Sequence, residues 1–372
     1  MKVRYDDQIF VELRRGGIAR YFVELMRAFS ARAELDVVVQ RGWRWTRNEH
    51  VLDARLGGRL TVPGGSRRRV LGAANSAARL LGRETSDLSH PTYYGAAGLA
   101  RRRTGPMVVT IHDMTPELFP DLFPRGNPHD RKLEYVRRAA VILCVSANTR
   151  ADLLDVYGPI AAPILVTHLG VDERFRPPAT ELRPSAPYLL YVGNRDAYKD
   201  FRVALESFAQ IAPDHPGLSL LAVGGGPFTQ TEQDLIARWG LGSSVANRSV
   251  SDAELPRVYG NAAVFVNPSR YEGFGLTVLE AMACGTPTVL ADSSSLPEVA
   301  GSAAVYFPPG DSGAMAAQLR RLLGDSELRR RMSEKGVDRA RDLTWLKTAT
   351  ATSRAYRLAL GHPAQDAMSE SS

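Results

Sequence analysis

The sequence contains little cysteine: only Cys144 and Cys284 occur among its 372 residues. Two cysteines without a Cys-x-x-Cys spacing cannot build a disulfide framework. No window holds the ~18 uninterrupted apolar residues that a membrane-spanning helix needs, and residues 1–7 lack the apolar core of a signal peptide. These absences argue against a disulfide-rich secreted protein and a membrane-spanning one, so we expect a cytoplasmic location.

Lysine is also scarce, since only five of the 47 cationic residues are lysines. The charge is unevenly distributed along the chain. Residues 1–168 hold 26 Lys and Arg against 17 Asp and Glu, a net charge of +9, whereas residues 169–372 have a net charge of −2. A coding bias towards arginine explains the ratio of arginine to lysine. It does not explain why the net positive charge is concentrated in the first half of the chain. We therefore interpret the basic first half as a functional feature.

The overall composition is that of a globular protein, with 44% apolar and 23% charged residues. Its length predicts two domains at about 150 residues each. Short β-branched runs alternate with helix-length segments, a pattern typical of parallel sheets covered by helices. We expect strands at Lys2–Tyr5, Asp36–Gln40, Met107–Ile111, Val141–Val145, Ile164–Thr167, Tyr188–Val192, Leu218–Val223, Val264–Asn267, Thr288–Ala291 and Ala304–Phe307.

Four prolines among charged residues at 172–187 predict a linker between the two domains. The chain after the last strand reads as three helices, Gly313–Leu323, Ser326–Arg341 and Trp345–Leu360. Two segments fit the strand–helix rhythm poorly: Gly57–Gly82, which contains three consecutive arginines at 67–69, and Pro120–Asp130. The first is a mobile loop, an amphipathic element or a solvated face. We expect an N-terminal domain at residues 1–171, a linker at 172–187 and a C-terminal domain at 188–344. The last helix is expected at residues 345–361, followed by a disordered tail at 362–372.

The strongest local pattern is the glycine-rich turn Glu272-Gly273-Phe274-Gly275, which follows an expected strand and opens a helix near Leu276. Such a turn lets backbone N–H groups approach an anion at a helix N-terminus. Two glutamates, Glu272 and Glu280, stand eight residues apart around the turn. Glu280, about one turn into the helix, is expected near the end closest to a ligand, where its carboxylate would accept hydrogen bonds from sugar hydroxyls. By pattern alone, Gly273 and Gly275 could equally serve packing.

Residues 267–287 resemble the C-terminal signature of family 4 glycosyltransferases, retaining enzymes with an E-x7-E motif. Five other stretches resemble the family in the same order: Gly16–Tyr21, Val109–Met114, Ala139–Ser146, His168–Asp172 and Tyr191–Lys199. The resemblance covers about residues 1–360. It implies an α/β protein of GT-B fold, with two Rossmann-like doubly wound domains facing a cleft and the C-terminal helix crossing back to the N-domain.

The activity implied by the resemblance is the transfer of a sugar from a nucleoside diphosphate sugar to an acceptor hydroxyl, with retention of configuration. GDP-mannose is a candidate donor, and the acceptor is a saccharide, a lipid-linked molecule or a small molecule. The chain contains no Asp-x-Asp, which metal-dependent GT-A enzymes use to hold a cation. We therefore expect no metal and no cofactor. The basic first half suggests an anionic acceptor and peripheral contact with the inner membrane surface.

Four residues are catalytic candidates under this resemblance. Arg195 and Lys199 follow an expected strand, where two cations suit the charge that develops on a leaving pyrophosphate. Glu272 is expected to contact the donor sugar, and His112, at the end of another strand, to position it. The plain alternatives are a surface cation for Lys199 and a satisfied structural histidine for His112.

Further residues are expected to bind the donor. Gly16 and Gly17, which lack a Cβ, let the first helix approach the donor phosphate or the acceptor closely, unless they only form a tight turn. The family pattern also implicates Glu280 at the ribose, a base contact near Asn247–Val250, and the backbone at Gly193, Phe274, Gly275 and Leu276. The sequence departs from the pattern at Thr277, where proline is common, and at Asp200, where asparagine is frequent.

Three other functions are compatible with parts of this pattern. A GT-B nucleotide-sugar epimerase shares the fold, but the E-x7-E turn argues against it. A tailoring glycosyltransferase for a soluble natural product differs only in its acceptor. A nucleic-acid binder would use the basic half, and it would show salt-sensitive DNA or RNA binding without stabilisation by nucleoside diphosphates. We expect no nucleic-acid partner.

Overall fold

The computed structural model describes residues 1–41, 43, 45–59, 70–75, 85–99, 105–124, 126–178, 187–195 and 197–362. The arginine run at 67–69, the middle of the predicted linker and the predicted tail beyond residue 362 lie outside the described residues. The chain divides into two compact units. Unit 1 is Met1–Leu169 with Trp345–Ser372, and unit 2 is Gly170–Thr344.

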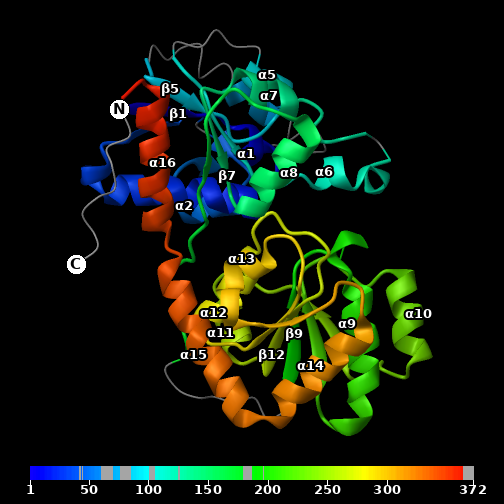
Figure 1. The fold of residues 1–372 in the computed structure, drawn as a ribbon. Coiled ribbons are helices and arrows are strands. Elements are labelled where there is room, and N and C mark those ends of the chain that lie inside the picture. Colours follow the sequence, from blue (N-terminus) through cyan, green and yellow to red (C-terminus); the bar gives the residue numbers. More distant parts are fainter. Residues whose placement is uncertain are drawn as a thin grey trace. The chain divides into compact units, whose positions relative to one another are not determined.

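Unit 1 is built on parallel strands (Figure 1). They form two three-stranded sheets. The order in the first sheet is β2 (Val38–Arg41), β1 (Lys2–Tyr5), β5 (Leu88–His90). The order in the second sheet is β6 (Val108–Ile111), β7 (Val141–Cys144), β8 (Ile164–Val166). An isolated parallel bridge between Ser89 and Met107 connects β5 to β6. Every residue of β6 and β7 is buried, as the nearly continuous apolar runs of these strands predict. A short parallel pair, β3 (Trp45–Thr46) and β4 (Gly58–Arg59), lies apart from these sheets.

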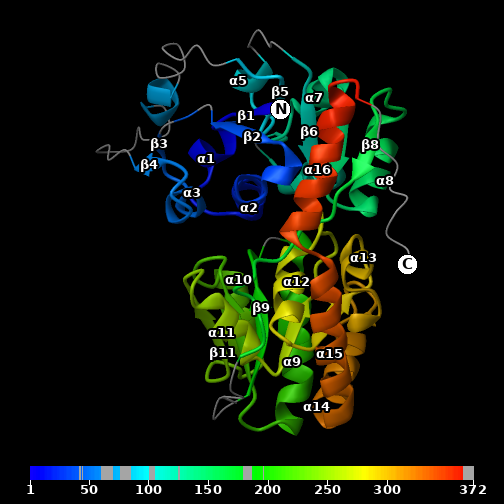
Figure 2. The same cartoon turned by 90° about the vertical axis from the view of Figure 1, so that its left-hand side faces the viewer.

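Two long helices of unit 1 pack against each other, although more than 300 residues separate them in sequence. They are α2 (Gly17–Ala31) and α16 (Trp345–Ala359), and α16 also packs on β6 and β7 (Figure 2). The last helix therefore belongs to unit 1, as the resemblance implied. Further helices of unit 1 are α1 (Gln8–Glu12), α3 (Glu49–Asp53), α5 (Ala96–Leu99), α6 (Thr115–Leu118), α7 (Lys132–Arg138) and α8 (Ala147–Tyr157), and residues 70–75 are helical as well.

A buried hydrogen-bond network anchors α16 to the sheet of unit 1. The Tyr356 hydroxyl lies 2.6 Å from the Tyr5 hydroxyl and 2.7 Å from Nδ1 of His90. On the other side of the ring, Nε2 of His90 lies 2.8 Å from Oγ1 of Thr110, which also lies 3.1 Å from the Tyr21 hydroxyl. Burial lowers the pKa of His90 to about 3. The imidazole is therefore neutral and can donate at one nitrogen while accepting at the other.

Unit 2 contains one six-stranded parallel sheet. Its order is β11 (Val245–Arg248), β10 (Ser219–Val223), β9 (Tyr188–Val192), β12 (Val264–Asn267), β13 (Thr288–Ala291), β14 (Val305–Phe307). The order reverses at β9, because β10 and β11 extend the sheet to one side and β12 to β14 extend it to the other. In doubly wound sheets, ligands bind beyond the carboxyl ends of the strands at this reversal.

The helices of unit 2 are α9 (Phe201–Ile211), α10 (Gln230–Arg238), α11 (Leu255–Gly260), α12 (Leu276–Ala283), α13 (Leu296–Ala300), α14 (Ser312–Gly324) and α15 (Ser326–Asp342). Single 3-10 turns in the two units lie at Ala33–Leu35, Pro120–Leu122, Ala197–Lys199, Ala212–Asp214 and Gly301–Ala303. Among the described residues, no helix is long and apolar enough to cross a membrane.

The expected strands are confirmed, and their bounds differ from the predicted ones by at most two residues. β2 begins at Val38 rather than at Asp36, because Asp36 has a left-handed φ of 51° after a 3-10 turn. The sequence prediction missed β3, β4, β5 and β11, which are short and carry polar residues or glycine. The predicted first domain also includes Gly170 and Val171, whereas both belong to unit 2, where the Val171 N–H donates to the Leu343 carbonyl at 3.1 Å.

The network around Tyr356 predicts a specific loss of stability. Tyr356→Phe removes one hydroxyl and leaves buried groups on Tyr5 and His90 without this partner. The free energy of unfolding should fall by about 1–3 kcal/mol, measured by urea denaturation. Tyr306→Phe is the matched control, because its hydroxyl donates to the Gly301 carbonyl in an exposed bond and should contribute little. Equal losses in the two variants would contradict the anchoring role.

Candidate active site

An ion pair lies at the strand-order reversal of unit 2. Lys199 follows β9 and ends the 3-10 turn Ala197–Lys199, while Glu272 follows the neighbouring strand β12. The Lys199 Nζ and Glu272 Oε2 atoms are 2.6 Å apart, and the two side chains are 18% and 13% exposed. The structure thus brings together two of the four predicted catalytic residues, at the edge of the sheet where a ligand is expected.

The Glu272 carboxylate is held by further contacts. Its Oε1 accepts from the Ser269 hydroxyl at 2.9 Å and from Asn267 Nδ2 at 3.3 Å. The Glu272 backbone is fixed as well, since its N–H donates to Ser294 Oγ at 2.8 Å and its carbonyl accepts from Ser295 Oγ at 2.9 Å. The sequence analysis missed these four supporting residues, although Asn267 and Ser269 stand inside the recognised motif. The carboxylate is therefore oriented before any ligand arrives.

The structure shows a packing role for Gly275, one of the two roles that the sequence left open for the glycine-rich turn. Gly275 has a φ of 98°, and a Cβ on it would lie 3.1 Å from Leu296 Cδ2, so conformation and packing both require glycine there. Phe274 is buried. α12 begins at Leu276, and the first N–H groups of a helix have no intrahelical acceptor. Glu280, in the second turn of α12, is 3% exposed and accepts from the Tyr259 hydroxyl at 2.9 Å.

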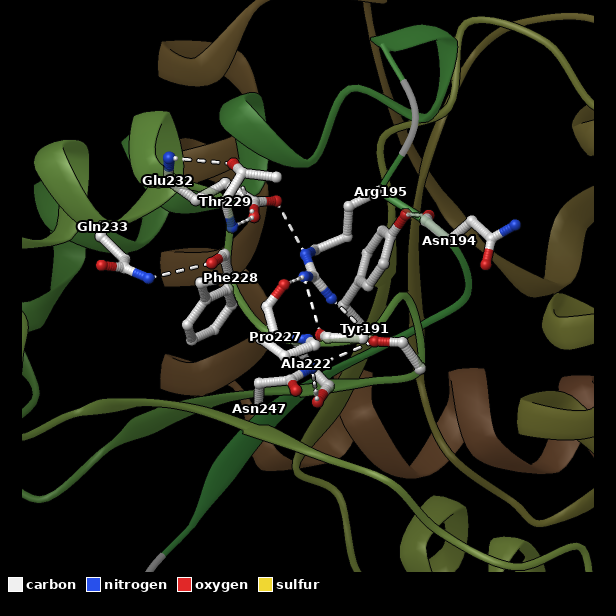
Figure 3. Close-up of polar contacts among 12 residues, drawn as sticks. Tyr191, Asn194, Arg195, Ala222, Pro227, Phe228, Thr229, Glu232, Gln233 and Asn247 are labelled. Carbon is white, nitrogen blue, oxygen red and sulfur yellow. Dashed lines mark hydrogen bonds and ion pairs between the residues drawn. The ribbon is translucent and has the colours of Figure 1, made fainter.

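Figure 3 shows the environment of Arg195, which differs from the single carboxylate partner described for Lys199. Its Nε donates to Glu232 Oε1 at 2.7 Å, and its other guanidinium bonds go to main-chain carbonyls of the turn after β10. The Arg195 side chain is only 3% exposed. Gly193, two residues earlier, has a φ of 147°, and its N–H donates to the Val223 carbonyl at 2.9 Å. The sequence placed Arg195 beside Lys199 as a second phosphate ligand, but it did not anticipate this set of partners.

His112, the fourth catalytic candidate, follows β6 in unit 1. Its ring packs edge-on against Tyr21 and Phe22 of α2, with centroid distances of 5.0 and 5.8 Å. Its Nε2 is buried and has no hydrogen-bond partner among the described residues. Burial lowers the pKa of His112 to about 3, so the ring is neutral. Gly16 caps α2 and Gly17 begins it, so the predicted glycine turn and the His112 ring are linked through one helix.

A buried charged cluster, missed in the sequence analysis, lies next to His112. Lys132 is 0% exposed, and its Nζ donates to Glu117 Oε2 at 2.8 Å and to the Asp113 carbonyl at 2.9 Å. Burial by itself would raise the pKa of Asp113, but the Lys132 charge, with His129 and other neighbours, lowers it below the usual value. Burial also lowers the pKa of His129. Lys132, like Lys199, is one of only five lysines in the sequence.

The expected absence of a metal stays a prediction. Within the part of the chain that the structure describes, no three His, Cys, Asp or Glu side chains gather as metal ligands do. The nearest positive charge to the Glu272 carboxylate is the Lys199 ammonium described above.

Two α/β units, each built on parallel strands, are typical of the GT-B class of proteins. Solved structures agree: sucrose-phosphate synthase from Thermosynechococcus elongatus superimposes with a TM-score of 0.75 and 22% identity, over 96% of this chain and 98% of that one. The Anabaena protein HepE, solved in complex with UDP-glucose, gives a TM-score of 0.73 and 18% identity over 94% of this chain and 97% of that one. The predicted GT-B fold is confirmed.

The chain belongs to glycosyltransferase family 4. Residues 15–175 match the family model described as Glycosyltransferase Family 4, and residues 172–339 match Glycosyl transferases group 1. The chain is 30% identical to the O-antigen chain mannosyltransferase B of Escherichia coli over 285 residues, which are 72% of this chain and 74% of that relative. It is a hexosyltransferase that uses a nucleotide sugar.

The neutral state of His112 predicts a pH dependence of stability. Its folded pKa of about 3 lies below its ordinary value of 6.5, so the unfolded chain binds more protons than the folded one between these values. Stability should therefore fall as the pH is lowered through this window, by about 1.4 kcal/mol per pH unit for this one group. His112→Gln should reduce the slope of the free energy of unfolding by that amount between about pH 6 and about pH 4.

Urea denaturation at several pH values measures this slope. Tyr306→Phe is the control, because it removes no group that titrates below pH 7 and should retain the wild-type slope. An unchanged slope in His112→Gln would show that the folded protein accommodates a protonated His112.

Proposed function

We propose that this protein is a retaining glycosyltransferase that moves mannose from GDP-mannose to a saccharide hydroxyl, in polysaccharide or glycolipid biosynthesis. The observation that carries the reaction is the Lys199–Glu272 pair at the strand-order reversal. The choice of mannose is supported by the 30% identity to the O-antigen chain mannosyltransferase B.

Lys199 is the cation proposed for the donor pyrophosphate. Its ammonium is a compact charge on a flexible stem, and it is more exposed than the Arg195 side chain. A pyrophosphate at the edge of the sheet would compete with Glu272 for this ammonium, and the freed Glu272 oxygen could then accept a hydrogen bond from a sugar hydroxyl. A fixed cation beside the leaving phosphate stabilises the charge that develops there, as donors in an oxyanion hole do.

The proposed chemistry proceeds on one face of the sugar. The bond from the anomeric carbon to the leaving phosphate oxygen breaks, and a bond to the acceptor oxygen forms on the same face. The acceptor hydroxyl gives its proton to the leaving phosphate oxygen, so no protein base is required. Lys199 offsets part of the negative charge of the departing nucleoside diphosphate, and the scheme includes no metal.

The remaining donor contacts stay as the resemblance implied them. His112 is proposed to position the donor sugar, and its support is a neutral ring whose Nε2 lacks a partner among the described residues. Glu280 is proposed for the ribose, with the backbone of Gly193 and of Phe274–Leu276 beside the phosphates. Gly16 and Gly17 are proposed to lie against the donor phosphate or the acceptor.

The first functional test removes the Lys199 charge. Lys199→Met should lower kcat for mannose transfer from GDP-mannose by about 10²- to 10³-fold, the effect of losing one stabilising donor at a developing charge. Lys335→Met is the matched control, because Lys335 is an exposed lysine on α15 of the same unit. It should retain wild-type kcat.

Three outcomes would correct different parts of this proposal. Transfer from UDP-glucose but not from GDP-mannose would replace the donor while leaving the reaction intact. A product of inverted configuration, seen by NMR, would exclude the retaining route. Loss of activity in EDTA that Mg²⁺ restores would show that a metal, rather than Lys199 alone, neutralises the leaving group.

We also propose that the acceptor is presented at an anionic membrane surface. The support is the net charge of +9 within residues 1–168, since basic surfaces are attracted to anionic lipids within a Debye length. The protein should sediment with phosphatidylglycerol vesicles at low salt and be released at high salt, while phosphatidylcholine vesicles should not bind it. Absence of binding to both vesicles at low salt would indicate a soluble acceptor.

A further inference from the structure

Three consecutive glycines form an exposed turn directly after β10. Gly224, Gly225 and Gly226 have φ values of 91°, 69° and 72°, a backbone conformation that other residues rarely adopt. Glycine loses more conformational freedom on ordering than any other residue, so a run of three needs support from outside the turn. The turn lies at the carboxyl edge of the sheet next to the end of β9, the edge at which the donor is proposed to bind.

The Arg195 guanidinium supplies this support. Nη1 donates to the Gly224 carbonyl at 2.7 Å, and Nη2 donates to the carbonyls of Gly226 at 3.0 Å and Pro227 at 2.7 Å (Figure 3). With the bond from Nε to Glu232, four of the five guanidinium N–H groups have protein partners. A Cβ on Gly225 would lie only 2.7 Å from Nη1, so the guanidinium lies directly against the turn.

Aromatic rings flank the same guanidinium. Its central carbon lies 5.6 Å from the centroid of Phe201 and 5.0 Å from that of Phe228. Contacts of this kind favour a cation at a fixed place. They leave the Arg195 side chain 3% exposed, whereas a ligand for a pyrophosphate needs N–H groups that the pyrophosphate can reach.

Glu232 connects this clamp to the start of α10. Its Oε1 accepts from Arg195, while its Oε2 accepts from the Thr229 N–H at 2.6 Å and from the Thr229 hydroxyl at 3.0 Å. Thr229 and Glu232 form a capping box at the N-terminus of α10. One arginine therefore fixes both ends of the segment from Gly224 to Thr229. Asn247 adds a bond from β11, since its Nδ2 donates to the Gly224 carbonyl at 3.0 Å.

We infer that Arg195 is a positioning residue: its guanidinium holds the Gly224–Pro227 turn as a wall of the donor site, and it does not bind the donor phosphates itself. This inference rests on the proposed function for the identity of the ligand. It replaces the direct phosphate contact that the sequence analysis expected of Arg195, and it leaves Lys199 as the cation that meets the donor.

Two variants separate positioning from direct binding, with UDP and GDP as the calorimetric probes. Arg195→Lys keeps the charge but cannot satisfy acceptors in four directions, because an ammonium lacks the planar fork. Glu232→Gln leaves the Arg195 charge in place but removes its carboxylate partner. If Arg195 positions the turn, both variants should weaken nucleotide binding by at least about tenfold and raise KM for the nucleotide sugar more than they lower kcat.

A direct ligand would behave differently. Arg195→Lys would retain most of the affinity, and Glu232→Gln would retain or increase it, because the guanidinium would be released towards the phosphates. Either result would overturn the inference. Arg202→Lys and Glu206→Gln are the matched controls, because these residues form an exposed i,i+4 ion pair on α9 of the same unit. Neither control should change nucleotide affinity, and circular dichroism should show all four variants folded.

Amide hydrogen exchange tests the clamp without a ligand. In Glu232→Gln, the amides of residues 224–226, 228 and 229 should exchange at least about tenfold faster than in Glu206→Gln, because local protection falls when the supporting contacts are lost. Equal exchange in these two variants would contradict the clamp. Failure of the wild-type protein to bind UDP and GDP would count against the proposed donor instead, and the exchange result would still decide the role of Arg195.

Discussion

The reversal of strand order between β9 and β12 is the constraint on which the site depends. Parallel strands end at the same edge of a sheet, and at the reversal the connections from two neighbouring strands leave in opposite directions. This geometry brings Lys199 and Glu272, which are 73 residues apart in sequence, to a distance of 2.6 Å. The serines that fix the Glu272 backbone come from the connection after β13, the next strand along. The site is therefore assembled from loops whose positions are set by the sheet.

Buried polar groups in unit 1 hold together segments that are far apart in the sequence. The Tyr356 hydroxyl reaches Tyr5 and His90 only because α16 returns to a sheet formed by the first half of the chain. Lys132 forms an ion pair with Glu117 inside the same unit. A buried charge that loses its partner costs about 3–5 kcal/mol, so these contacts favour one arrangement of the segments strongly. Both networks lie next to His112, whose neutral state depends on the same burial.

Much of this could be predicted from sequence, and the failures have identifiable causes. Buried parallel strands such as β7 and β12 are continuous apolar runs, so their positions were clear, whereas β5 and β11 are short and partly polar and gave no such signal. The spacing Thr229-x-x-Glu232 is a capping-box pattern in the sequence, and it marks the N-terminus of α10. The partners of Arg195 could not be predicted, because a sequence pattern does not show in which direction a side chain points when its residue follows a strand. Lys132 and Lys199 are both among the five lysines of the sequence. The burial of Lys132 depends on how α7 packs in the folded unit, which the sequence pattern does not show.

The two cations after β9 show why residue type matters as much as position. Arg195 and Lys199 are four residues apart, yet one is enclosed by carbonyls and the other pairs with a single carboxylate. A planar fork with five donors suits a fixed ring of acceptors, whereas a compact ammonium on a flexible stem can exchange one anion for another. A site that binds and releases a charged donor needs both properties, a rigid wall and a movable charge. Exchanging the two residue types would keep the net charge of the loop and remove each property from the place where it is used.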